Sequence, residues 1–438
     1  MSFQRKLIVV ALASALPWAS AQAQSAADLQ KEISALKAQL QSLQQKVEAM
    51  SKKPDNTVLE QQVNRLEQKL ELADDASEKA GFKGLKINGT LEAAFKYDNS
   101  VGSHDFNATS GYTDSLNYAG VGMLQITKET QDGEGVDWTL RLLPGADAGA
   151  VVHEASVSIP LNKENRIIGG VIPDFQGYEY PFPNANSTLG NQLITHNALY
   201  DLAGASQYKG MGMAHTFDGG KYALKWLIAN VDAAGFDSNG AAYNNGTTNS
   251  SVALAYRADW FANEYAYLGF SGLHGSVNRN FSIMALDGGY TRGDWQFNGQ
   301  VTIGSMRNAA TNGDDAAWTG LSAFVGYKAT PRLQLLARAD YIENAKNGGG
   351  TYVYPAGGSA GLGQRLQSDG ATGDVDDSGV AVGANLMRLS LGTNYQINSN
   401  TQWKVEYRID QSTGYNFIVD GTPTRSKNII ATSLMLSF

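Results

Sequence analysis

The chain contains no cysteine among its 438 residues. This absence excludes disulfide-stapled scaffolds, thiolate zinc sites and cysteine nucleophiles. Charged residues are also scarce, because Asp, Glu, Lys and Arg make up 17% of the chain, against about 25% in soluble domains. The formal net charge of −8 argues against nucleic acid as the main partner.

Long apolar segments are missing as well. After residue 24, no stretch approaches the roughly 18 unbroken apolar residues of a membrane-spanning helix. A helical membrane protein is therefore excluded, whereas a membrane β-barrel is not, because its sequence signal is only a weak alternation. The chain has few prolines, 10, but 48 glycines, 20 tyrosines and seven tryptophans, which indicates an ordered protein.

The amino-terminal segment has the three parts of a secretory signal peptide. Arg5 and Lys6 are basic, residues 7–18 are apolar, and residues 21–23 form an Ala-Gln-Ala cleavage site. We expect residues 1–23 to be removed. An uncleaved anchor helix is the alternative, but the apolar run is shorter than the roughly 20 residues that a span needs.

Residues 24–80 repeat in sevens. Apolar residues alternate at spacings of four and three, which is typical of a coiled-coil seam: Leu29, Ile33, Leu36, Leu40, Leu43, Val47 and Met50. Pro54 stops or kinks the helix. The pattern predicts an oligomerising α-helical coiled coil, and a helical hairpin that folds back at Pro54 is the alternative.

The period changes from 3.5 to 2 at residue 84. In the first such stretch, apolar residues from Leu85 to Tyr97 alternate with polar residues from Lys86 to Asp98. The alternation lasts longer than an ordinary strand of 5–6 residues and fits a tilted membrane strand. Charged side chains recur on one face of later stretches, which a dry core does not tolerate but a water-filled lumen does.

Sixteen such stretches predict an all-β fold over residues 84–438, a transmembrane antiparallel 16-stranded β-barrel preceded by the α-helical coiled coil. We expect strands at 85–98, 114–129, 135–143, 149–160, 165–173, 206–217, 221–231, 249–261, 264–276, 279–291, 294–306, 316–329, 332–344, 382–398, 401–412 and 426–438. Short turns alternate with long links at 173–206, 231–249, 343–382 and 411–426, which is the asymmetry of outer-membrane barrels.

The last five residues, Leu434 to Phe438, alternate apolar side chains and end on an aromatic. This ending resembles the carboxy-terminal assembly signal of outer-membrane barrel proteins, and with the strand plan the chain resembles a sixteen-stranded Gram-negative porin. The amino-terminal coiled coil is similar to that of the phosphate- and polyphosphate-selective porin group. The resemblance implies a homotrimer in outer-membrane lipid with the coil in the periplasm, where peptidoglycan or a periplasmic protein is a candidate partner.

The same resemblance implies that the long link after the fifth strand, 173–206, folds inward and narrows the pore. This link contains no lysine or arginine, unlike the channels of phosphate-selective porins. Its acidic and aromatic residues are the candidate constriction: Asp174, Glu179, Asp201, Tyr178, Tyr180 and Phe182. Fixed negative charge in a narrow passage favours cations, whereas the same carboxylates on an outer loop would be solvated. The aromatics either stack on solutes or pack the link against the wall.

Basic residues on the predicted lumen faces are the candidate pore lining: Lys96, Arg141, Lys225, Arg257, Arg338, Arg388, Lys404 and Arg408. A basic wall opposite an acidic link would produce a transverse field. In the alternative, the acidic residues on the same faces, such as Asp340, Glu406 and Asp410, pair with these cations and brace the barrel.

The sequence therefore predicts a passive outer-membrane diffusion channel for small hydrophilic solutes or ions, with a preference for cations or neutral solutes and no cofactor or metal. A barrel that only anchors a trimeric coiled coil, as a tether or adhesin, is the alternative. An enzyme is disfavoured, because the G-x-S-x-G pattern at 357–361 lies in a glycine-rich link rather than at a strand–helix turn. The Asp-rich stretch at 374–379 lacks the glutamate that an EF-hand needs at its twelfth position.

Overall fold

The computed structural model describes residues 84–99, 116–130, 135–142, 152–179, 192–199, 207–231, 252–277, 279–310, 312–349 and 363–438, with residues 34, 35, 37–39, 41, 42 and 65. The chain divides into two compact units, Met1–Leu85 and Lys86–Phe438. In the first unit the described residues before Gly84 are helical and exposed. The predicted signal peptide lies outside the described residues, and so does most of the predicted coiled coil. No helix within the described part is long and apolar enough to cross a membrane.

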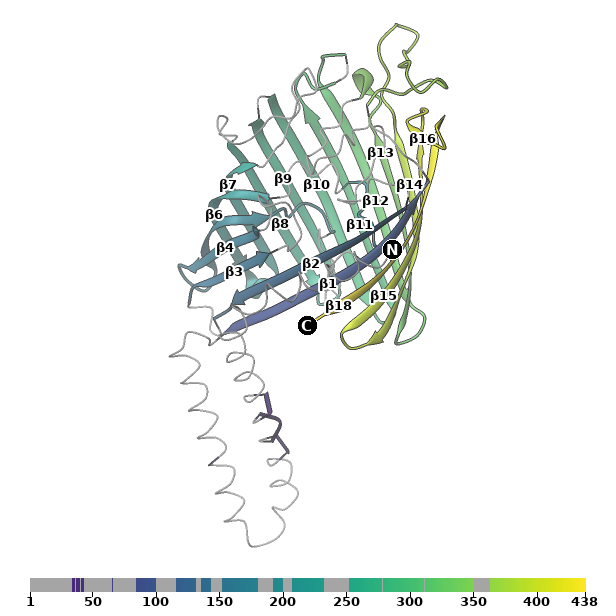
Figure 1. The fold of residues 1–438 in the computed structure, drawn as a ribbon. Coiled ribbons are helices and arrows are strands. Elements are labelled where there is room, and N and C mark those ends of the chain that lie inside the picture. The colour runs from purple at the N-terminus through teal and green to yellow at the C-terminus, as the bar shows by residue number, and fades with distance from the viewer. Residues whose placement is uncertain are drawn as a thin grey trace, which may run out of the picture. The chain divides into compact units, whose positions relative to one another are not determined.

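The second unit is a closed antiparallel barrel of sixteen strands (Figure 1). The barrel strands are β1 (Leu85–Asp98), β2 (Leu116–Lys128), β3 (Asp137–Leu142), β4 (Val152–Pro160), β5 (Asn165–Pro173), β6 (Gln207–Phe217), β7 (Tyr222–Val231), β8 (Val252–Asn263), β9 (Ala266–Val277), β10 (Arg279–Arg292), β11 (Trp295–Met306), β12 (Ala316–Lys328), β13 (Leu333–Glu343), β14 (Leu386–Asn398), β15 (Thr401–Ser412) and β18 (Ser426–Ser437). Each strand pairs with its neighbour in sequence, and β18 closes the barrel on β1. The predicted barrel is confirmed, with strand ends within a few residues of those expected.

One predicted link contains additional structure. The segment 411–426 was expected to be a loop, but it holds a short hairpin of β16 (Phe417–Val419) and β17 (Thr422–Thr424), which pair in a separate two-stranded sheet. The prediction was wrong here because three-residue strands are too short to show a period-2 pattern. Asp420 and Gly421, which have φ of 50° and 74°, form the tight turn between them.

Short turns join the strands at one end of the barrel. Two examples are the 3₁₀ turn Asp218–Gly220 between β6 and β7 and the two-residue link Gly293–Asp294 between β10 and β11. Gly219, Gly220 and Gly293 have positive φ, and the space around each is open, so backbone conformation favours glycine there. Short turns at one end and longer links at the other give the two ends of the barrel different character.

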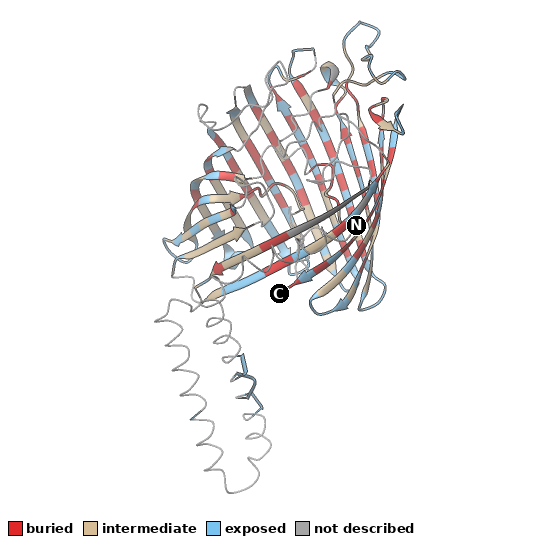
Figure 2. Ribbon diagram, viewed as in Figure 1, coloured by how far each residue is buried: buried red, intermediate tan, exposed pale blue. Residues whose placement is uncertain are grey.

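The burial pattern is inverted relative to a soluble protein. Burial alternates along the strands (Figure 2), and large apolar side chains on the outer face are exposed, among them Leu91, Phe95, Ile228, Leu391 and Trp403. The aromatic residues Trp295, Phe297 and Tyr327 stack together near the short-turn end of β11 and β12, with ring centroids 4.6–5.6 Å apart. An apolar exterior with aromatics near its edge is the surface that lipid requires.

The barrel interior is layered along its axis. At the long-loop end, inward side chains of β11–β14 are mainly apolar and belong to one cluster that includes Met306, Trp318, Ile342 and Leu386. The next layer is ionic and contains Arg338, Asp340, Arg388, Arg408 and Asp410, all 2% exposed or less. Carboxamides follow at the short-turn end, including Gln296, Gln334 and Asn394. The link after β5 contacts all three layers.

Candidate functional site

The link after β5 begins at a buried carboxylate. Asp174 is 5% exposed, its Oδ1 atom accepts a hydrogen bond from the Tyr208 hydroxyl of β6, and it also accepts one from the Gln176 backbone at 3.1 Å. Burial raises the pKa of the Asp174 carboxyl above its ordinary value, although the bond from Tyr208 opposes that change. Asp174 therefore holds the start of the link against the wall and is a weaker fixed negative charge than a solvated aspartate.

The next turn of the link lies against β8, β10 and β11. Arg257 is held by Asp287 through two bonds of 2.8 and 2.9 Å, and its Nη1 atom donates to the carbonyls of Phe175 and Gly177 at 3.2 and 3.1 Å. Gly177 has φ of 75°, and a Cβ atom there would lie 2.2 Å from Oε1 of Gln300. The positive φ therefore favours glycine at this position, and a larger residue would also displace the Gln300 amide.

Tyr178 and Glu179 continue along the same wall. The Tyr178 hydroxyl lies 2.7 Å from Oγ of Ser322 on β12. Glu179 forms an ion pair with Arg338 of β13 at 3.0 Å and accepts a hydrogen bond from the backbone N–H of Asn197. The carboxylate thus joins the first part of the link to its second described part, residues 192–199.

The second part of the link is fastened through its backbone and one threonine. The Thr195 N–H and hydroxyl donate to the two oxygens of Glu406 on β15 at 2.7 and 2.6 Å. The Ala198 N–H donates to Asp340 at 3.0 Å, and Asn394 donates to the carbonyl of Gln192 at 2.9 Å. The second part of the link therefore bonds to three adjacent strands, β13, β14 and β15.

Two leucines of the link, Leu193 and Leu199, occupy the spaces that two wall glycines, Gly392 and Gly320, leave open. We call these two spaces the glycine sockets. A Cβ atom at Gly392 would lie 2.4 Å from Cδ2 of Leu193, and one at Gly320 would lie 2.0 Å from Cδ2 of Leu199. Both leucines are at most 2% exposed. Glycine within a strand often marks such close approach.

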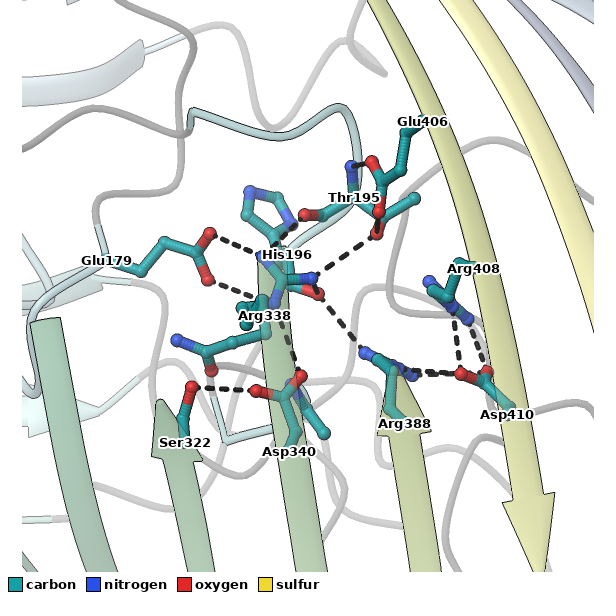
Figure 3. Close-up of polar contacts among 12 residues, drawn as sticks. Glu179, Thr195, His196, Ser322, Arg338, Asp340, Arg388, Glu406, Arg408 and Asp410 are labelled. Atoms are coloured by element: carbon teal, nitrogen blue, oxygen red, sulfur yellow. Dashed lines mark hydrogen bonds and ion pairs between the residues drawn. The ribbon is translucent and has the colours of Figure 1, made fainter. Parts of the chain in front are cut away.

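A row of three buried arginines crosses β13, β14 and β15 beneath the link (Figure 3). Arg338 donates to the carbonyl of Thr195 at 3.0 Å and lies 3.3 Å from Asp340. Arg388 donates to the carbonyl of His196 at 3.2 Å and to Asp410 at 2.9 Å, and Arg408 also donates to Asp410. Guanidinium groups suit this arrangement because their rigid fork serves several acceptors at once.

Other predicted lining residues also have partners. Arg141 pairs with Glu154 at 2.9 Å, Lys404 lies 4.0 Å from Glu92, and Lys225 places Nζ 4.2 Å from the Phe175 ring centroid, a cation–π distance. The side chain of Lys96 is outside the described residues, as are Tyr180, Phe182 and Asp201. The wall is therefore a mosaic of opposite charges in contact, not a surface of one sign.

Several residues that form this site were not predicted as part of it. Thr195, His196 and Ala198 act largely through backbone atoms, for which the sequence carries no signal. Gly320 and Gly392 interrupt strand patterns, and that interruption is a detectable sign of close approach. No group of three or more His, Asp or Glu side chains within the described ranges is placed to hold a metal ion.

The lining of the barrel interior is polar and ionic. Polar and paired ionic side chains face the interior, and fixed dipoles in a narrow space substitute for the hydration of a hydrophilic solute. The interior ionic layer is neutralised locally, because each described arginine of the row contacts a carboxylate.

Comparison with known proteins agrees with this geometry. The fold is similar to that of the outer membrane channel DcaP of Acinetobacter baumannii, with 9% identity, a TM-score of 0.52 and coverage of 81% of this chain and 97% of that one. It is also similar to an anion-selective porin from Comamonas acidovorans, with 8% identity, a TM-score of 0.51 and coverage of 81% and 99%. No curated protein matches the sequence. Residues 84–438 match the family described as "Putative beta-barrel porin-2, OmpL-like". The chain therefore belongs to this OmpL-like family of outer-membrane β-barrel porins.

Proposed function

We propose that the protein is a passive diffusion channel for small hydrophilic solutes, with a preference for neutral solutes or cations over anions. The observation that carries the proposal is the barrel interior, where polar and ionic side chains line the wall and a link of the same chain is fastened against it. The wall arginines are paired with carboxylates, so few positive charges are left to attract anions.

The ion preference is argued from the link at 173–206. It adds Asp174 and Glu179 to the interior and has no lysine or arginine. Because Glu179 is paired with Arg338, the preference for cations is expected to be modest and neutral solutes are expected to pass readily. Asp201, Tyr180 and Phe182 belong to the same proposed constriction.

Planar bilayer recordings test the channel and its preference together. We expect stable open channels. In a KCl gradient, the sign of the reversal potential should show that K⁺ passes more readily than Cl⁻. Replacing Glu179 and Asp201 with Gln and Asn should move that potential toward zero, whereas Asp218→Asn, on a short turn outside the lumen, should not. Absence of open channels would reject the channel, and a clear anion preference of the wild type would reject the acidic constriction.

We further propose that residues 24–80 form a periplasmic coiled coil that helps three barrels associate or spaces them from the cell wall. The heptad spacing supports this proposal. A chain without residues 25–80 should give less stable trimers, or weaker retention on peptidoglycan, in native gels and cell-wall pull-downs. Unchanged behaviour in both assays would contradict it.

A further inference from the structure

A polar cavity lies at the short-turn end of the barrel, apart from the arginine row. Its volume is about 260 Å³. Six carboxamide side chains line it, and we call this set the amide vestibule: Gln192, Gln296, Gln334, Asn394, Gln396 and Gln402. Five of them come from β11, β13, β14 and β15, and Gln192 comes from the link that packs inside the barrel.

Strand register brings these side chains together. Gln334 is paired with Asn394 across β13 and β14, and Gln396 with Gln402 across β14 and β15. All five strand residues occupy inward positions, and on β13, β14 and β15 they lie an even number of residues, four to eight, from those of the ionic layer. The vestibule is thus a further layer of the lumen wall, at the short-turn end of the barrel.

A wall glycine opens space for the cavity. A Cβ atom at Gly326 of β12 would lie 2.8 Å from Nε2 of Gln334 and 3.6 Å from Cβ of Gln296. Gly326 has an ordinary negative φ, so its backbone does not require glycine. The lack of a side chain between the two glutamines instead leaves their amide groups facing the same space.

The six carboxamides that line the cavity carry no net charge. A carboxamide has both donors and an acceptor, although Asn394 already donates to the carbonyl of Gln192 and Gln396 to those of Asn398 and Thr401. Hydroxyl groups likewise donate and accept. Three exposed residues at the short turns, Asp294, Lys328 and Arg332, also line the cavity. Because these turn residues are exposed to solvent, water and salt screen their charges, and the carboxamides themselves offer an ion no net charge to replace its hydration.

We infer that the amide vestibule is a binding subsite for neutral polyhydroxylated solutes of monosaccharide size, which pause there during passage. The inference rests on the proposed channel function and adds a solute class to it. A subsite on the path concentrates its solute in the channel, and weak hydrogen bonds still let the solute leave.

Glucose in planar bilayer recordings of the full chain tests the inference. We expect glucose to lower the conductance in a saturable way, and more strongly than triethylene glycol dimethyl ether, a solute of similar mass that only accepts hydrogen bonds. In the double variant Gln334→Met and Gln402→Met, the half-saturating glucose concentration should rise by about fivefold or more, since each lost hydrogen bond weakens binding by roughly that factor.

Gln411→Met on β15 is the matched control, because Gln411 is exposed on the opposite face of the barrel wall. Its glucose response should equal that of the wild type. Equal half-saturation in the wild type and the double variant, or equal effects of glucose and the ether, would overturn the inference.

If the wild type opens no channel, the proposed function fails, and saturation-transfer NMR of glucose with the detergent-solubilised protein decides the subsite separately. A signal lost in the double variant would support the subsite, and no signal in the wild type would reject it.

Discussion

At the residue scale, glycines determine how closely the inner link approaches the wall. Leu193 packs with Phe324, Leu336 and Tyr178 in one buried cluster, and it reaches them only because residue 392 has no side chain. The Gly320 socket does the same for Leu199. Neither glycine has a positive φ, so the restriction at Gly320 comes from the link. At Gly392 the carbonyl oxygen of Val405 on β15, 3.0 Å from a Cβ atom, adds to it.

Gly392→Val is therefore predicted to displace Leu193 and loosen the link while the barrel still closes. Overpacking of this kind costs about 1–3 kcal/mol, and single-channel recordings should show larger or noisier conductance. Gly299→Ala is the control, because a Cβ atom there would find its nearest neighbour 3.8 Å away. A Gly392→Val channel with wild-type conductance and noise would contradict the socket.

At the scale of elements, the link between β5 and β6 is held by a few charged side chains of the sheet. Arg338 contacts Glu179, Thr195 and Asp340 at distances of 3.0–3.3 Å, so one side chain joins both described parts of the link to β13. Arg388 and Glu406 add contacts from β14 and β15. The wall charges thus position the link, whatever further part they have in ion selection.

Arg338→Gln is predicted to release the link and to leave two buried carboxylates without their main partner. Loss of one member of a buried ion pair costs about 3–5 kcal/mol. Arg338→Lys should recover the charge but not the contacts to the Thr195 carbonyl, because an ammonium lacks the planar fork. Denaturant unfolding in lipid vesicles and limited proteolysis of the link measure both effects. Wild-type protection of the link in Arg338→Gln would show that other contacts suffice.

At the scale of the whole molecule, the barrel is stabilised by a lipid-facing exterior and a polar interior. On the outer face of β14, the free-energy cost of a charged side chain should depend on its depth in the membrane. Leu391 lies near the middle of the strand and is 51% exposed, and Ile397 lies near its short-turn end and is 43% exposed. Both side chains point outward, so they differ mainly in their distance from the strand ends.

Leu391→Arg is predicted to destabilise the folded barrel by about 2–4 kcal/mol, and Ile397→Arg by about 0–1 kcal/mol, because the cost of a charge falls toward the interface. Urea unfolding in phospholipid vesicles measures the difference, and each variant serves as the reference for the other. Equal costs at the two positions would contradict the assignment of this face to the hydrocarbon region.

Much of the barrel was determined by the sequence alone. Alternation with a period of two is a local property of strands, so the spans from β1 to β18 and the inward placement of Arg338, Arg388, Lys404 and Arg408 could be predicted without any long-range information. The hairpin of β16 and β17 escaped because its strands are too short to show a period.

Only the tertiary structure decided how the interior is filled. Thr195 and Glu406 are 211 positions apart, and local periodicity carries no information about contacts over that distance. The structure also decided that Glu179 meets Arg338, that Leu193 and Leu199 enter glycine sockets, and that carboxamides from separate strands share one cavity. Closing the sheet into a barrel creates these neighbours, because closure brings inward positions of different strands to the same depth.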